Sequence, residues 1–61
     1  MEKEIFNTDE AAEYCNISKS KFIELRKNGR ISYLMPNERS YRYTKKDLDD
    51  YLESTRVKAI K

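Results

Sequence analysis

The spacing of apolar residues changes along the chain from helical to alternating and then back to helical. Close to the start, three small apolar residues share the spacing of one narrow helix face. These residues are Ala11, Ala12 and Cys15. Asn7 precedes the group and Glu10 follows three residues later, which is the pattern of a capping box. The sequence therefore predicts a short first helix over about residues 8–15.

A tight turn and a second helix are expected next. Asn16 tolerates the left-handed backbone conformation that such a turn requires, and Ser18 is a favourable cap for the following helix. Gly29, the only glycine, stands where the C-terminus of that helix is expected. These signals predict a helix over about residues 19–28. The residues expected to face inward are Ile17, Phe22, Leu25 and the stem of Arg26.

The region after Gly29 alternates in the way that strands do. In the first run, Ile31, Tyr33 and Met35 alternate with Ser32 and Leu34, and in the second run Tyr41 and Tyr43 flank Arg42. The segment Pro36–Ser40 between the runs is rich in turn formers. We expect a hairpin over about residues 31–43, and Ile5–Phe6 as a short third strand.

A last helix begins after Thr44, because Asp47 completes a second capping box. Tyr43 precedes the cap and is placed to pack on Leu48 as a hydrophobic staple. The buried stripe of this helix is expected to be Leu48, Tyr51 and Leu52. Residues 55–61 have no clear pattern and are either a frayed extension or a mobile basic tail.

Two helices joined by a four-residue turn, then a basic hairpin and a closing helix, form a winged helix-turn-helix. The predicted fold class is therefore α+β. At 61 residues the chain is long enough for one small domain, which we expect to span residues 1–61 with its core at about 5–54.

Charge is segregated along the chain although the net charge is only +2. Residues 1–14 carry one basic and five acidic residues, a net −4, and residues 15–46 carry nine basic and two acidic residues, a net +7. Residues 47–54 carry four acids, a net −4, and the remaining seven residues carry three bases, a net +3. A basic middle between acidic flanks is typical of a face that binds a polyanion, although charge blocks are often simply solvated surface.

Several classes of protein are disfavoured by composition. The chain has no histidine, the commonest general base and metal ligand, and its single Cys15 is interpreted as a small core residue. The acidic residues of the last helix are expected on its cap and solvated face, not in a catalytic cluster. No apolar run approaches the ~18 residues of a membrane span, and no signal peptide opens the chain. We expect a cytoplasmic, nucleoid-associated protein with no catalytic residue, no metal and no cofactor.

The run FNTDEAAEYCNISKSKFIELRKNGRI, together with RSYRYTKKDLDDYL, resembles the small excisionase and MerR-like helix-turn-helix proteins of bacteria, phages and mobile elements. The resemblance covers about residues 5–53. Two positions depart from it: Asn16 stands where the family usually has glycine, and Glu24 stands on the outer helix face, where it would not bind a phosphate.

The resemblance implies roles in binding double-stranded DNA. The residues implied to face the major groove are Lys19, Ser20, Ile23, Glu24 and Lys27. Those implied to contact phosphate are Ser18, Lys21, Arg30, Lys45 and Lys46, the last two at a helix start where free amides also favour phosphate. The wing residues implied to reach the backbone or minor groove are Asn37, Arg39, Ser40 and Arg42.

Some of these residues have a second interpretation. Glu24 either pairs within its helix, with Lys21 or Asn28, or accepts a hydrogen bond from a cytosine amino group. Arg42 either contacts DNA or pairs with an acid such as Asp47. Ile23 either touches a thymine methyl or is half-buried against the hairpin. The lysines of the second helix form either a DNA contact or a solvated face, and the tyrosines are interpreted as core and rim, with base stacking as the alternative.

Three functions remain open at this stage. The first is an excisionase-like architectural factor that binds and bends DNA beside an integrase or other recombinase, as monomers bound cooperatively to adjacent sites. The second is a small transcriptional regulator of phage, plasmid or mobile-element genes, although the chain is too short for the dimerisation helix or effector domain of MerR regulators. The third is a protein-interaction adaptor without DNA binding, which the +7 middle disfavours.

Overall fold

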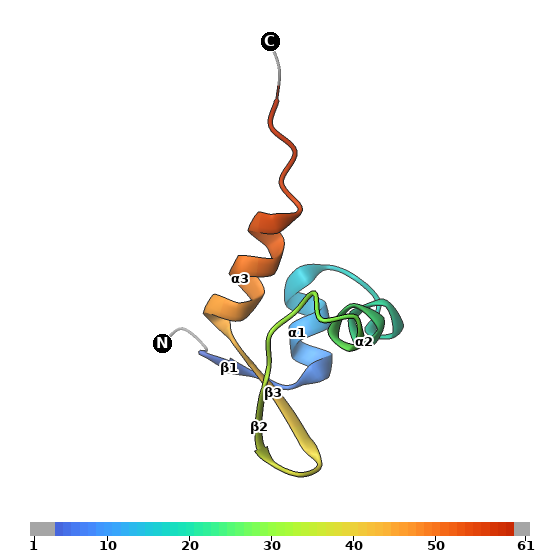
Figure 1. Cartoon of the computed structure of the whole chain (residues 1–61), viewed down its shortest axis with the longest axis vertical. Coiled ribbons are helices and arrows are strands. Elements are labelled where there is room, and N and C mark those ends of the chain that lie inside the picture. Colours follow the sequence, from blue (N-terminus) through green and yellow to red (C-terminus); the bar gives the residue numbers. More distant parts are fainter. Residues whose placement is uncertain (1–3, 60–61) are drawn as a thin grey trace.

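A computed structural model describes residues 4–59, which form three helices and a three-stranded antiparallel sheet (Figure 1). The elements in chain order are β1 (Ile5–Phe6), α1 (Thr8–Cys15), α2 (Lys19–Lys27), β2 (Leu34–Asn37), β3 (Ser40–Thr44) and α3 (Lys45–Ser54). The predicted α+β winged helix-turn-helix is confirmed. No helix within residues 4–59 is long and apolar enough to cross a membrane.

The ends of α1 and α2 are set by the residues that the sequence indicated. The Asn7 side chain accepts a hydrogen bond of 2.8 Å from the Glu10 amide, and the Glu10 carboxylate accepts one of 3.0 Å from the Asn7 amide. Asn16 has a left-handed φ of 60°, and the Ser18 hydroxyl accepts from the Lys21 amide. Gly29 follows α2 with a φ of +76°. Both predicted helices are therefore confirmed, the second ending one residue early.

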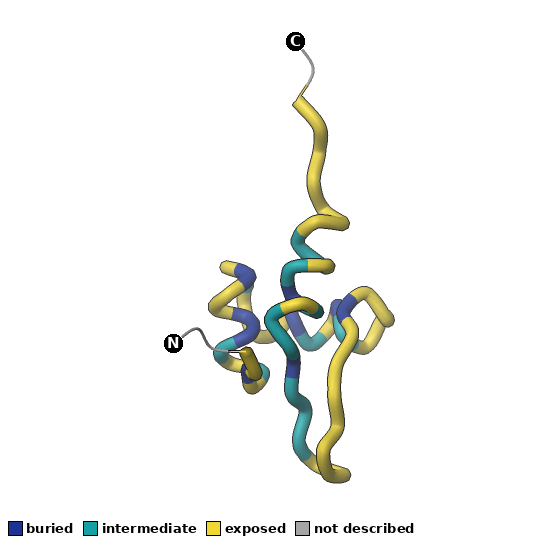
Figure 2. The backbone as a smooth tube through the Cα atoms, turned by 90° about the vertical axis from the view of Figure 1, so that its left-hand side faces the viewer, coloured by how far each residue is buried: buried dark blue, intermediate teal, exposed yellow. Residues whose placement is uncertain are grey.

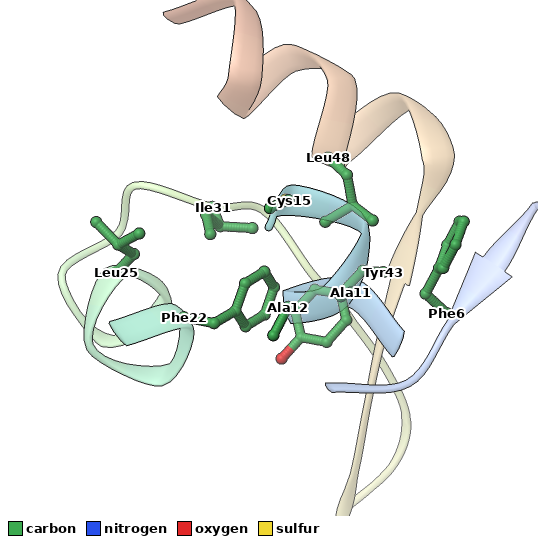
Figure 3. Close-up of a cluster of buried hydrophobic side chains, with 9 residues drawn as sticks. All are labelled: Phe6, Ala11, Ala12, Cys15, Phe22, Leu25, Ile31, Tyr43 and Leu48. Carbon is green, nitrogen blue, oxygen red and sulfur yellow. The ribbon is translucent and has the colours of Figure 1, made fainter. Parts of the chain in front are cut away.

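Nine buried side chains from the three helices, β1, β3 and the loop before β2 form one core (Figure 3). They are Phe6, Ala11, Ala12, Cys15, Phe22, Leu25, Ile31, Tyr43 and Leu48. Ile17, Tyr51 and Leu52 are partly buried and pack against it. The small residues of α1 allow α2, α3 and β3 to approach that helix closely. This core places α2 at one side of the molecule (Figure 1), and five of its nine residues are exposed.

The hairpin is shorter than predicted. Ile31 is only 2% exposed and belongs to the core, but it lies outside β2, which begins at Leu34. The chain leaving Gly29 must first bury Ile31, so the alternating pattern overstates the length of the strand. The turn is also tighter than predicted, because Pro36 lies within β2 and the strands are joined by residues 38–39.

Strand order explains why proline is tolerated there. The order β1-β3-β2 makes β2 an edge strand, and an edge strand does not need every amide for pairing. All four residues of β2 are exposed, as Figure 2 shows. The β2–β3 hairpin, called the wing below, extends beyond the helices (Figure 1).

The third strand and the last helix are confirmed. β1 pairs with β3 in the register Ile5↔Thr44 and Phe6↔Tyr43. β3 then runs directly into α3, whose start is closed by the predicted box between Thr44 and Asp47. After α3, residues 56–59 have no regular structure and are exposed, and the last two residues of the predicted basic tail lie outside the described range, as do residues 1–3 of the predicted domain.

Candidate nucleic-acid interface

The outward side of α2 carries a shallow, open hollow of about 500 Å³. Its lining residues are Ser20, Lys21, Ile23, Glu24, Lys27 and Asn28. Four of the five residues predicted to face a major groove therefore share one surface. Ile23 is half-buried, and the others among those four are exposed.

The fifth residue, Lys19, lies at the N-terminal end of α2 beside α1. Its ammonium group is 3.1 Å from the Asp9 carboxylate, and both side chains are more than half exposed. Lys21 and Glu24 form a second exposed pair at 3.7 Å, so in the free protein Glu24 pairs with Lys21 rather than with the Asn28 side chain. Exposed ion pairs contribute about 0–1 kcal/mol. A phosphate can therefore displace either carboxylate at little cost.

Within the basic segment, residues 15–46, three basic side chains form no ion pair or hydrogen bond with the described part of the chain. They are Lys27 at the end of α2, Arg30 after it and Arg39 at the tip of the wing. All three are exposed. Because protein groups do not satisfy them, their donors are available to an anion. The unpaired cations therefore extend from the outward face of α2 to the wing.

The wing residues have different local partners. The Asn37 side chain accepts a hydrogen bond of 3.1 Å from the Arg39 amide, which shapes the turn. The Arg42 guanidinium donates to the Tyr41 carbonyl at 2.8 Å, so its alternative pairing with Asp47 is not formed. Ser40 is half-buried at the start of β3. Arg39 is thus the wing cation best placed to meet a ligand.

A match to a known protein family spans both α2 and the wing. Residues 5–56 match a family model described as a helix-turn-helix domain. The chain belongs to this helix-turn-helix family. No curated protein and no solved structure matched it. Helix-turn-helix domains bind DNA through the second helix of the motif, which here is α2, and DNA binding is the activity that membership assigns to this domain.

In this helix-turn-helix domain the basic pair at the start of α3 is already engaged. Lys45 lies 3.4 Å from Asp49 and Lys46 lies 3.1 Å from Asp50, each one helical turn along. The Thr44 hydroxyl accepts from the Asp47 amide, so part of the predicted free-amide site is filled by the helix cap. A phosphate contact at Lys45 and Lys46 stays a prediction that requires exchange of these partners.

One contact between α2 and β3 was missed by the sequence patterns. The Arg26 guanidinium carbon lies 3.8 Å from the centre of the Tyr41 ring, and one of its nitrogens donates to the Tyr43 hydroxyl at 3.1 Å. Spacing identified only the inward direction of the Arg26 stem. The partners lie on another element 15 and 17 residues away, so no local pattern marks them.

A polar contact fixes α1 of the domain against α3. The Tyr14 hydroxyl donates to the Asp49 carboxylate at 2.5 Å, and the Tyr14 ring packs edge-on against Phe6. This hydrogen bond raises the pKa of Tyr14 and lowers the pKa of Asp49. Burial raises the pKa of the Cys15 thiol, in accordance with its interpretation as a core residue. Tyr14, Asp49 and Cys15 lie outside the outward face of α2.

Proposed function

We propose that α2 enters the major groove of double-stranded DNA and reads base edges with its outward side chains. The proposed reading residues are Lys19, Ser20, Ile23, Glu24 and Lys27. The observation that carries this proposal is the uncovered outward face of α2, which is free of the core while its inner face is fixed by it. An α-helix fits the major groove, where all four base pairs present distinct patterns.

The remaining basic residues would set the register of the protein on the duplex. Ser18, Lys21, Arg30, Lys45 and Lys46 are proposed phosphate contacts, and Asn37, Arg39, Ser40 and Arg42 are proposed wing contacts to the backbone or the adjacent minor groove. Support comes from the unpaired state of Arg30 and Arg39 and from the weak, exposed pairing of Lys21. Phosphate contacts position a protein without specifying sequence.

At the level of biological role, the proposed function is that of an excisionase-like architectural factor in the recombination of a mobile element. The resemblance to excisionases supports this role. A helix and a wing held by one core also support it, because a duplex that contacts both must follow their fixed geometry. Monomers bound to adjacent sites would bend the DNA toward a form that an integrase or other recombinase uses.

The test begins with duplexes selected from a random pool by the purified protein. The selected sequence, placed at different positions along one fragment, should give position-dependent gel mobility, which reports a bend. If an integrase gene lies beside the gene for this protein, excision by that integrase should then require the protein. Selection of no common sequence would contradict the base-reading proposal. Unbent complexes that repress transcription without affecting excision would instead indicate a transcriptional regulator.

A further inference from the structure

Direct side-chain contact between α2 and β3 depends on few residues. In the ring contacts and hydrogen bonds of residues 4–59, only Phe22 and Arg26 of α2 reach β3. Phe22 packs edge-on against Tyr43 with ring centres 4.8 Å apart, within the core (Figure 3). Arg26 contacts both Tyr41 and Tyr43.

The two contacts of Arg26 lie two residues apart on one strand, so they are on the same face of β3. The guanidinium covers the Tyr41 ring at 3.8 Å and donates to the Tyr43 hydroxyl at 3.1 Å. Phe22 contacts β3 only at Tyr43, whereas the Arg26 guanidinium adds a second point at Tyr41, and two points on the strand resist its rotation relative to α2 better than one. Arginine suits this use because its donors lie in a fixed plane that can both stack on a ring and donate.

Both ends of the contact are extended by further interactions. The Tyr43 hydroxyl shares a hydrogen bond of 3.2 Å with Thr8 at the start of α1, and its own proton is available for this because Arg26 donates to the oxygen. The Tyr41 ring packs edge-on against Tyr33, 5.4 Å away, just before β2. Arg26 is thus joined to β3 directly, and through the two tyrosines to the residue that precedes β2 and to α1.

We propose that Arg26 is a positioning residue that fixes the wing relative to α2, so that both contact one duplex together. The inference rests on the proposed function, in which α2 and Arg39 of the wing bind the same DNA. When two binding elements are linked, the second binds as if at a high effective concentration only if its geometry is right. Arg26 therefore contributes to affinity and specificity without touching DNA.

The decisive measurement is a double-mutant cycle in binding to the selected duplex. Arg26→Met keeps a long side chain against Tyr41 but removes the charge and the donor, and Arg39→Ala removes the wing contact. We expect Arg26→Met to weaken binding by about tenfold. Arg39→Ala should then reduce the affinity of the Arg26→Met protein several-fold less than it reduces the affinity of the wild type. Effects of the two changes that simply multiply would overturn the proposal.

Lys27→Met is the matched control, since Lys27 is the neighbouring cation on the outward side of α2. When Lys27→Met and Arg39→Ala are combined, their separate effects on affinity should multiply. Arg26→Lys should restore part of the coupling, because lysine keeps a cation over Tyr41 without the planar fork. Tyr43→Phe removes only the hydroxyl from a ring that stays in the core. This variant tests the proposal even if Arg26→Met does not fold. Arg39→Ala should weaken binding less in Tyr43→Phe than in the wild type, and an equal effect in both proteins would count against the proposal.

A measurement without DNA separates this inference from the proposed function. Residual dipolar couplings of backbone amides report the relative orientation of α2 and β3 in the free protein. Arg26→Met should change that orientation or average the β3 couplings, while the Lys27→Met protein stays like the wild type. Unchanged couplings in Arg26→Met would refute the positioning role. Absence of duplex binding by the wild type would instead refute the proposed function and leave this measurement decisive for Arg26.

Discussion

Glu24 is the residue whose role differs most between the free protein and the proposed complex. In the free protein its carboxylate lies 3.7 Å from Lys21 on the exposed face of α2. Such a pair contributes little to stability. In the proposed complex the same carboxylate accepts a hydrogen bond from a cytosine amino group. It would repel a phosphate at that position. A residue that repels phosphate but accepts from a base favours sequence selection over general affinity.

Glu24→Ala should therefore lower specificity more than affinity. We expect the ratio of affinities for selected and unrelated duplexes to fall by about tenfold, because one good base contact is worth about 1–3 kcal/mol. Binding to unrelated duplexes should strengthen slightly, since Lys21 is released. Fluorescence anisotropy with both duplexes measures this, and Glu13→Ala on exposed α1 is the control. Equal losses on all sequences would remove Glu24 from the reading set.

Asn16 is the one described non-glycine residue with a positive φ, at 60°. A side chain with a Cβ costs about 1–2 kcal/mol in this conformation, although asparagine is among the residues that tolerate it best. Asn16→Ala should lower the free energy of unfolding by about 1 kcal/mol, whereas Asn16→Gly should leave it unchanged or raise it.

Urea unfolding followed by circular dichroism measures both changes. Asn28→Ala is the matched control, because Asn28 follows α2 with an ordinary φ of −85°. An alanine at position 16 that is as stable as one at position 28 would show that the turn between α1 and α2 relaxes.

At the scale of elements, α1 and α3 are joined by the Tyr14–Asp49 hydrogen bond at 2.5 Å. The hydrogen bond from Tyr14 is the largest cause that lowers the pKa of Asp49 in the folded protein. An aspartate with a depressed pKa stabilises the fold above its unfolded pKa of about 3.9, and this stabilisation is lost as the pH falls through the folded value.

Asp49→Asn should accordingly destabilise the domain at neutral pH, and the difference from the wild type should vanish at pH values below the depressed pKa. Thermal unfolding from pH 7 down to acid conditions follows the difference. In a Tyr14→Phe background the same substitution should have a smaller effect at neutral pH, because the donor is gone. A difference between the two proteins that persists unchanged in acid would contradict this account.

The elements that were predictable from sequence are those fixed by local chemistry. The Asn7–Glu10 and Thr44–Asp47 boxes and the capping Ser18 each act within three residues, so their patterns were sufficient to place the helices. The outward face of α2 was also predictable, because helical periodicity separates it from Phe22 and Leu25.

The rest depended on tertiary contacts. Ile31 continues the alternating pattern of a strand, but burial in the core keeps it outside β2. Arg26 has the spacing of an inward residue, yet its contacts are with tyrosines of β3 that no local pattern connects to it. Arg42 had an acid, Asp47, nearby in sequence, but its guanidinium donates to the carbonyl of the preceding residue, Tyr41.

At the scale of the whole molecule, the described cations fall into three groups by their partners. Lys19, Lys21, Lys45, Lys46 and Arg56 have carboxylate partners. Arg26 and Arg42 donate hydrogen bonds to uncharged groups, and the side chains of Lys27, Arg30, Arg39 and Lys58 have no partner within the described part of the chain. The unpaired group is where a phosphate gains most, because it need not displace a carboxylate.

Binding to a duplex should therefore depend steeply on salt, with a log–log slope of about −0.9 for each neutralised phosphate. Arg39→Ala should reduce the magnitude of that slope by about 1. Arg56→Ala should leave it unchanged, because Arg56 pairs with Glu53 at the far end of α3. Titrations at several salt concentrations measure these slopes. A salt-independent affinity in the wild type would refute DNA binding through this face.

Because Cys15 is buried, the reactivity of its thiol reports whether the domain is folded. It is the only cysteine in the sequence, and its thiol is buried in the core with a raised pKa, so a thiol-specific reagent reaches it only when the core opens. The rate of labelling therefore measures the opening equilibrium under native conditions, without denaturant. A duplex that binds only the folded domain should slow this labelling in proportion to its occupancy. A single native thiol thus links stability and binding in one kinetic trace.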